Sequence, residues 1–240
     1  YQWTVRLEDV APDGKVSLVS GAAINPSQRF SRLAPAALVP GEPTTLATSI
    51  HFTTWRFQPG HRIRLAVANA QFPMIWPSPT PGTTHLLLGE NTWLELPKVP
   101  VANATDTACT LPPPEPSDVA PFGRELEKHN PAFNSVRDEK TGDSTFTTAS
   151  DITWVIRENK YQSRESYRWS VNDATPANAQ YHGERTNVFN IAGNEISLAT
   201  TARIASDAGY FNVTFTKTLR QNGSLVREKT WTDHIPRRYQ

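Results

Sequence analysis

Sulfur-containing residues are nearly missing from this chain of 240 residues, which has one cysteine, Cys109, and one methionine, Met74. A single cysteine excludes an internal disulfide framework and a zinc cage made of cysteines. The methionine lies inside the sequence, and Tyr1 already begins an alternating, strand-like pattern. We therefore expect that a segment before Tyr1 is missing, either through processing or because the sequence is a fragment.

Charge imbalance and long apolar runs are missing too. The 24 lysine and arginine residues nearly balance the 23 aspartate and glutamate residues, which leaves a net charge of +1. Such a balance gives no general attraction to nucleic acid or to anionic lipid. No run approaches the roughly 18 apolar residues that a membrane helix requires. We therefore expect neither nucleic acid nor a membrane among the partners of this chain.

The sequence also lacks the short motifs that mark common active sites. It contains no G-x-S-x-G elbow, no G-x-x-x-x-G-K-[ST] loop, no H-E-x-x-H and no G-x-G-x-x-G. None of its six histidines lies at close metal-binding spacing from another. A hydrolase serine is expected on a strained turn between strand and helix, and no strand–helix alternation is present. We therefore predict no catalytic, cofactor-binding or metal-binding residue in this chain.

The sequence does contain stretches in which apolar and polar residues alternate with a period of two, and it contains 20 prolines. This alternation predicts strands with one buried face, and the prolines disfavour long helices. Trp3, Val5 and Leu7 alternate with polar residues, and Asp13-Gly14 after them is a typical hairpin turn. Further strands of the first hundred residues are predicted at 46–52, 55–57, 63–67, 86–88 and 93–96. The predicted fold class is therefore all-β.

A proline-rich segment divides the chain. Residues 101–121 contain the run Leu-Pro-Pro-Pro-Glu-Pro, which cannot pair in a sheet because proline lacks an N–H group. We predict a connector at 101–121, between a first domain at 1–100 and a β-rich extension at 122–240. A short polar stretch at 123–129 is predicted to form a helical turn at the start of this extension.

The last hairpin is the clearest element of the extension. Asn222-Gly223, the preferred type I′ turn pair, separates the strands predicted at 210–220 and 225–232. The predicted register places an apolar pair and an opposite-charge pair across the two strands: Leu219 opposite Val226, and Lys217 opposite Glu228.

A basic segment and an apolar loop supply the candidate contact residues. The basic residues after the Pro59-Gly60 turn face either a ligand or partner domain, or the solvent as the charged side of a strand. The loop at 72–77 is too apolar for full exposure, so we expect it to cover a partner or to rim a pocket. The candidate contact residues are His61, Arg62, Arg64, Phe72, Ile75 and Trp76.

Two further patterns have competing interpretations. Seven tryptophans on a β scaffold suit the stacking of sugars, but large aromatic residues also fill cores and domain contacts. Asp138, Glu139 and Asp143 have the composition of a calcium loop, but their spacing differs from the EF-hand pattern and Lys140 lies among them. An ordinary polar turn is the simpler interpretation of the second pattern.

An ordered set of short motifs in the first hundred residues resembles a known family. The motifs are Leu7-Glu8-Asp9-Val10-x-Pro12-Asp13-Gly14, Gly21, Pro40-Gly41, Phe57-x-Pro59-Gly60-His61-Arg62-Ile63-Arg64-Leu65, Phe72-Pro73 and Leu94-x-Leu96-Pro97. Their order and gaps resemble the C-terminal domain of the Xaa-Pro dipeptidyl-peptidase family. That family includes cocaine esterase and the α-amino-acid ester hydrolases, together called CocE/NonD hydrolases. The later motifs Asp138-x-x-Thr141-Gly142 and Trp231-x-x-x-Ile235-Pro236-Arg237 are similar to the tail of its longer members.

The resemblance implies a jelly-roll, galactose-binding-like β-sandwich that is truncated at its N-terminus and carries a C-terminal β extension. In the family this domain follows an α/β-hydrolase domain that holds a Ser-Asp-His triad, so no catalytic residue is transferred to this chain. The implied partner is that catalytic domain of the same parent protein, and an oligomer contact is a further expected role. The resemblance thus predicts a non-catalytic domain that helps to shape a substrate pocket. The alternative is a carbohydrate-binding β-sandwich module.

Overall fold

The computed structural model describes residues 2–80, 82–98, 113, 124–129 and 131–239. Its regular structure is nearly all β, in two antiparallel sheets, with short 3-10 turns η1 (Pro26–Gln28) and η3 (Pro176–Asn178). By their contacts, the described residues of 1–81 and 124–240 belong to one unit, and those of 82–123 belong to another. The predicted connector lies outside the described residues except for Pro113, so the two predicted boundaries between the three segments stay predictions.

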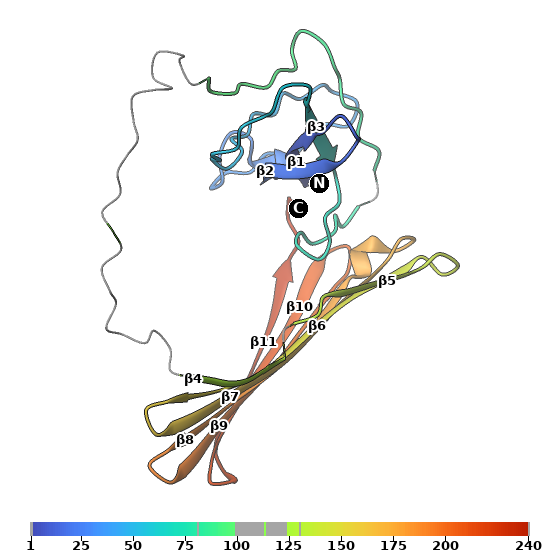
Figure 1. Ribbon diagram of the computed structural model, residues 1–240. Coiled ribbons are helices and arrows are strands. Elements are labelled where there is room, and N and C mark those ends of the chain that lie inside the picture. Colours follow the sequence, from blue (N-terminus) through green and yellow to red (C-terminus); the bar gives the residue numbers. More distant parts are fainter. Residues whose placement is uncertain (1, 81, 99–112, 114–123, 130, 240) are drawn as a thin grey trace. The chain divides into compact units, whose positions relative to one another are not determined.

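The first sheet has three strands in the order β2-β1-β3 (Figure 1). The strands are β1 (Trp3–Val10), β2 (Val16–Ile24) and β3 (Arg62–Ala68). The hairpin predicted around Asp13-Gly14 joins β1 to β2, and the strand predicted at 63–67 is β3. Because β1 is central, its residues Leu7 and Val10 are buried, and they form the core of this sheet.

Four other strands predicted in the first hundred residues are not present. Residues 46–52, 55–57, 86–88 and 93–96 have no strand conformation. Alternation specifies a strand only where a neighbouring strand offers hydrogen bonds and side-chain contacts. The segment 46–52 makes isolated hydrogen bonds with β2, from the His51 N–H to the Gly21 carbonyl and from Ser20 Oγ to the His51 carbonyl, but no continuous ladder, and Phe52 is almost fully exposed. The prediction of these strands was therefore wrong.

The second sheet is a meander with the order β11-β10-β9-β8-β7-β6-β4, and β5 also pairs with β6 (Figure 1). Its strands are β4 (Arg124–His129), β5 (Asn134–Asp138), β6 (Asp143–Ile156), β7 (Asn159–Asn172), β8 (Gln180–Ile191), β9 (Asn194–Ser206), β10 (Tyr210–Gln221) and β11 (Ser224–Pro236). The helical turn predicted at 123–129 is wrong, because this stretch pairs with β6 as β4. Pairing with a long neighbouring strand outweighs the local preference of a short polar segment.

The last hairpin has the predicted turn but a different register. Asn222 and Gly223 both have positive φ, at 49° and 79°, as a type I′ turn requires. However, Leu219 lies opposite Arg227 and Lys217 lies opposite Lys229. The register shifts by one residue next to Leu219, so a bulge near the turn displaces every pair beyond it.

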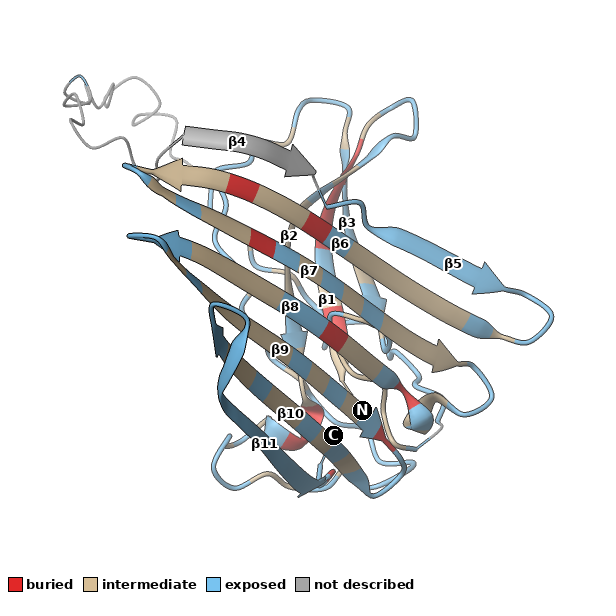
Figure 2. Ribbon diagram, turned by 90° about the horizontal axis from the view of Figure 1, so that it is seen from below, coloured by how far each residue is buried: buried red, intermediate tan, exposed pale blue. Residues whose placement is uncertain are grey.

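The register of the second sheet separates an aromatic face from a polar face. Residues that lie opposite each other across β6 to β11 project to the same side. The aromatic face comprises Phe146, Trp154, Tyr161, Tyr167, Trp169, Tyr181, Phe189, Phe211, Phe215 and Trp231. The opposite face carries mostly threonine, serine and charged residues. Figure 2 shows that few residues of β5 to β11 are buried, and the buried ones are small, such as Ser150, Ser163 and Ser206.

These features confirm an all-β chain with two antiparallel sheets, consistent with a β-sandwich. The jelly-roll, galactose-binding-like strand order remains a prediction. Among the described residues, no helix has the length and apolar composition that spanning a bilayer requires.

Candidate functional site

Two sequence motifs that are fifty residues apart lie side by side in the first sheet. The Leu-Glu-Asp-Val motif is on β1, and the Gly-His-Arg motif leads into β3. The antiparallel register places Asp9 opposite Ile63 and Glu8 opposite Arg64. Glu8 therefore faces a basic residue directly across the strand pair. Asp9 projects to the other face of the same pair, where it contacts His61 of the second motif.

The Asp9 carboxylate is the centre of the first group of contacts. It is 3% exposed, and its Oδ1 accepts a hydrogen bond from His61 Nδ1 at 2.8 Å. Its Oδ2 accepts a second bond from Trp55 Nε1 at 2.9 Å. Within the described chain, no hydroxyl group is hydrogen-bonded to this imidazole. The pair therefore anchors the turn at Pro59-Gly60, where Gly60 has a φ of 82°.

The Glu8 carboxylate is the centre of the second group. It is buried, and it accepts a hydrogen bond from Arg64 Nε at 2.6 Å. Arg6 Nε lies 3.5 Å from its other oxygen. Both arginine side chains are about half exposed, so two cations cover one buried carboxylate. Such pairing offsets the desolvation that a buried charge would otherwise suffer.

An exposed apolar row lies beside these charges. Ile63, Leu65 and Val67 project from the edge strand β3 on the face that carries Val5 and Leu7. They are 50%, 39% and 40% exposed. The apolar surface of the first sheet therefore runs from its buried centre to an open edge, and this β3 edge row is a candidate seam for another domain.

The apolar loop contacts the aromatic face of the second sheet. The Phe72 and Trp76 rings meet edge to face at 5.7 Å between centroids. Phe72 also packs on Phe146 at 5.7 Å, and Trp76 packs on Phe211 at 5.6 Å. Trp76 Nε1 donates a hydrogen bond to Ser206 Oγ at 2.8 Å. These two aromatic residues thus join the N-terminal segment to the end of the aromatic face.

Arg237 strengthens the same junction. Its guanidinium donates to the backbone oxygens of Asp207, at 2.7 Å, and of Pro77, and it lies over the Phe211 ring. Burial lowers the pKa of Arg237 from its usual value. The motif Trp-x-x-x-Ile-Pro-Arg therefore ends on a cation that closes the contact.

The candidate contact residues fall into two groups. His61 and Arg64 are held by buried carboxylates, and Arg62 is exposed at the start of β3. Phe72 and Trp76 lie against the second sheet, and the Ile75 N–H closes a turn on the Gln71 carbonyl. Their predicted role toward another domain remains a prediction.

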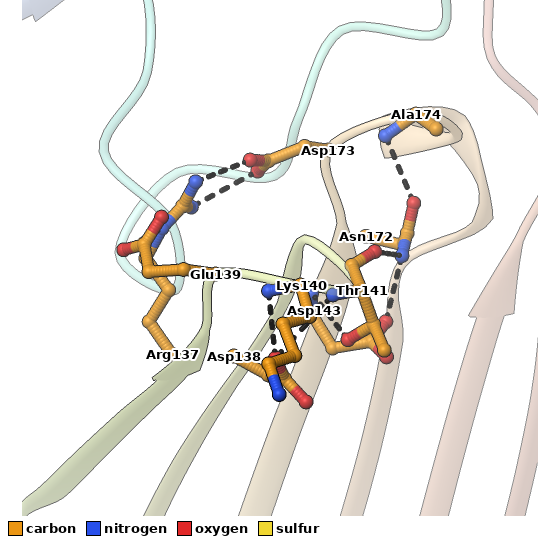
Figure 3. A network of polar contacts seen from close by, with 9 residues as sticks. All are labelled: Arg137, Asp138, Glu139, Lys140, Thr141, Asp143, Asn172, Asp173 and Ala174. Atoms are coloured by element: carbon orange, nitrogen blue, oxygen red, sulfur yellow. Dashed lines mark hydrogen bonds and ion pairs between the residues drawn. The ribbon is translucent and has the colours of Figure 1, made fainter.

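The acidic loop of the second sheet is a polar turn with its carboxylates engaged. In Figure 3, Arg137 donates to both oxygens of Asp173, and Asn172 donates to Asp143. The hydrogen bond from Arg137 lowers the pKa of Asp173. In the described part of the chain, no group of three or more histidine, cysteine, aspartate and glutamate residues has a geometry that suits a metal ion.

A row of charged residues crosses the middle of the aromatic face, and the sequence analysis missed it. Glu165 lies opposite Arg185, and Lys217 lies opposite Lys229. The Tyr167 hydroxyl donates a hydrogen bond to Glu165 at 2.8 Å. Burial is the larger cause, and this hydrogen bond the second, of the rise in the pKa of Tyr167 to about 12. These residues lie on different strands, so they can be grouped into a row once the register between the strands is known.

Comparison with known proteins identifies the first part of the chain. Residues 1–110 match the family model of the X-Pro dipeptidyl-peptidase C-terminal non-catalytic domain. This match confirms the resemblance carried by the motifs of β1 and β3. Neither the curated proteins nor the solved structures gave a match.

Proposed function

We propose that this chain is a non-catalytic C-terminal part of a serine hydrolase, either an X-Pro dipeptidyl-peptidase or a related ester hydrolase. It packs on the α/β-hydrolase catalytic domain of the same parent protein and helps to shape the substrate pocket. The family match over residues 1–110 supports this proposal, because the matched domain is described as non-catalytic.

The observation that carries the proposal is the β3 edge row beside the paired charges. Ile63, Leu65 and Val67 form an apolar strip, and Arg62 and His61 lie at its end. An apolar centre with a polar rim is the usual composition of an interface between domains. The ion pairs of Glu8 and Asp9 hold the strand that presents this strip.

The division of labour follows from the chemistry of acyl transfer. In serine hydrolases a serine activated by a histidine attacks the carbonyl carbon, and an acyl-enzyme forms. The catalytic domain supplies that triad in the proposed parent. This chain supplies a fixed wall, with His61, Arg62 and Arg64 at one part of it and Phe72, Ile75 and Trp76 at another.

The proposal is tested by producing the chain alone and together with the sequence that precedes it in its gene. Both products are assayed with dipeptide amides ending in proline and with simple esters. We expect turnover from the longer product only. In that product, Leu65→Asp is expected to lower kcat/KM at least tenfold, whereas Leu33→Asp, which alters a fully exposed loop residue, leaves it unchanged. Turnover by the 240 residues alone would overturn the proposal.

Carbohydrate binding remains the second candidate, because the aromatic face exposes a ring. Trp231 is 42% exposed, whereas Trp76 is packed between Phe72 and Phe211. A glycan array combined with tryptophan quenching separates the two functions. Millimolar or tighter sugar binding that is lost in Trp231→Ala and retained in Trp93→Ala would favour the second candidate.

A further inference from the structure

The last strand of the second sheet has a free edge. β11 pairs with β10 on one side, and on its other side no strand of the described chain pairs with it (Figure 2). All 13 of its residues are exposed. Its outward backbone N–H and C=O groups therefore offer a template for another strand.

The side chains of β11 form a self-complementary pattern. On the aromatic face the strand reads basic, basic, aromatic, acidic and apolar, and the residues are Arg227, Lys229, Trp231, Asp233 and Ile235. If two such strands run antiparallel with Thr230 opposite Thr230, Arg227 meets Asp233 and Lys229 meets Trp231. Each of these contacts occurs twice in the pair.

We propose that β11 pairs with β11 of a second copy of this chain, antiparallel and centred on Thr230. The pairing extends two sheets into one continuous sheet with a two-fold axis normal to it. Both aromatic faces then lie on the same side, because directly opposite residues of paired strands project to the same face.

Other registers of the same pair are poorer. A register centred on Trp231 pairs Lys229 with Asp233 but places Arg227 against Ile235, and a register centred on Lys229 places Lys229 against its own copy. Like charges directly opposite each other destabilise a strand pair. Among these three registers, the one centred on Thr230 places no basic side chain directly opposite an aliphatic side chain or a second basic side chain.

Two features that protect solvent-exposed edges, a bulge and a proline, lie at the ends of β11. The register shift lies near the turn, and Pro236 is the last residue of the strand. Lys229 lies over the ring of Trp231, with Nζ 4.7 Å from the centroid. Between 227 and 235 the strand is therefore regular and carries no proline, which suits pairing.

A cysteine scan tests the register directly. The full chain is used with Cys109→Ser as background, so that introduced cysteines are the only thiols. Thr230→Cys is expected to form a disulfide-linked dimer on mild oxidation, because opposite Cα atoms in antiparallel strands are about 5 Å apart. Ser224→Cys is the matched control on the same strand. In the proposed register the two copies of residue 224 are about 40 Å apart, so this variant stays unlinked.

Charge reversal supplies a second readout, measured as the dimer dissociation constant by sedimentation velocity. Asp233→Arg places two arginines opposite each other and is expected to raise this constant at least tenfold. The double variant Arg227→Asp with Asp233→Arg restores the opposite charges and is expected to recover the original value. The proposal would be overturned by any of three results. These are a monomeric parent chain, equal cross-linking of residues 224 and 230, and a double variant that does not recover dimerisation.

Discussion

In the three-stranded sheet the buried polar side chains include two carboxylates, Glu8 and Asp9, and each has a basic partner. In strands β5 to β11 of the eight-stranded sheet the buried side chains belong to small hydroxyl residues such as Ser150 and Ser206, and the charged residues are at least partly exposed. The first sheet thus buries charge within a small core around Leu7. The second sheet exposes part of a wide aromatic face.

This difference indicates where each sheet is sensitive to substitution. Removing one partner of a buried charge leaves the other unpaired, which costs more than the net value of the pair. Removing a half-exposed aromatic residue costs only part of its transfer free energy. The first sheet should therefore depend on a few residues, and the second on the fit of its register.

The largest expected effect is that of Leu7→Ala. Leu7 is 2% exposed at the centre of the first sheet, and a cavity there is expected to cost about 2–5 kcal/mol in the free energy of unfolding. Leu65, its partner across the strands, is the matched control. We expect Leu65→Ala to cost less than half as much in chemical denaturation, since Leu65 is 39% exposed and its truncation leaves no enclosed cavity. Equal losses would contradict the assignment of the core.

Gly183→Ala tests the packing of the aromatic face. A Cβ atom at Gly183 would lie 2.1 Å from the Tyr181 hydroxyl oxygen and 3.0 Å from Tyr167. Both rings must move, so we expect a loss of about 1–3 kcal/mol in thermal or chemical unfolding. Gly209→Ala is the control, because its nearest atom would be 3.6 Å away. A loss in the control but not at Gly183 would show that the rings do not cover this strand.

Asp9→Asn tests the buried carboxylate of the first sheet. The amide keeps the shape but provides a single acceptor oxygen for His61 and Trp55. We expect a loss of about 1–3 kcal/mol in the free energy of unfolding. Asp13→Asn, in an exposed turn, is expected to change stability by less than about 0.5 kcal/mol. A neutral Asp9→Asn would mean that the carboxylate charge is not needed to hold the turn.

The smallest expected effect concerns pH. The pKa of Tyr167 is raised to about 12 by burial and by its bond to Glu165, so the folded state favours the neutral phenol. The associated stability is fully present below pH 10 and is lost as the pH rises toward 12. In absorbance titrations at alkaline pH, Tyr167→Phe should remove a phenol that ionises late, near pH 12. An unchanged titration curve would contradict this assignment.

The sequence predicted local features better than pairing partners. Asn222-Gly223 and Asp13-Gly14 identified their hairpins, because turn geometry depends on adjacent residues. The segment 46–52 alternates equally well, yet it makes isolated hydrogen bonds with β2 and forms no ladder with it. Whether an alternating segment becomes a strand depends on residues far away in the sequence.

The candidate sites follow the same division. His61 and Arg64 were selected from their motif, but their carboxylate partners Asp9 and Glu8 emerged from the register of β1 with β3. The bulge beside Leu219 moved Lys217 from Glu228 to Lys229. A single extra residue near a turn is hard to detect by pattern, although it changes every later pair.

Labelling with a fluorophosphonate probe that reacts with activated serines tests the central proposal most directly. The probe is applied to the 240-residue chain and to the longer gene product, and the modified residues are located by mass spectrometry. The account predicts one labelled serine in the longer product, upstream of Tyr1, and none within residues 1–240. A stoichiometrically labelled serine within the 240 residues would contradict it.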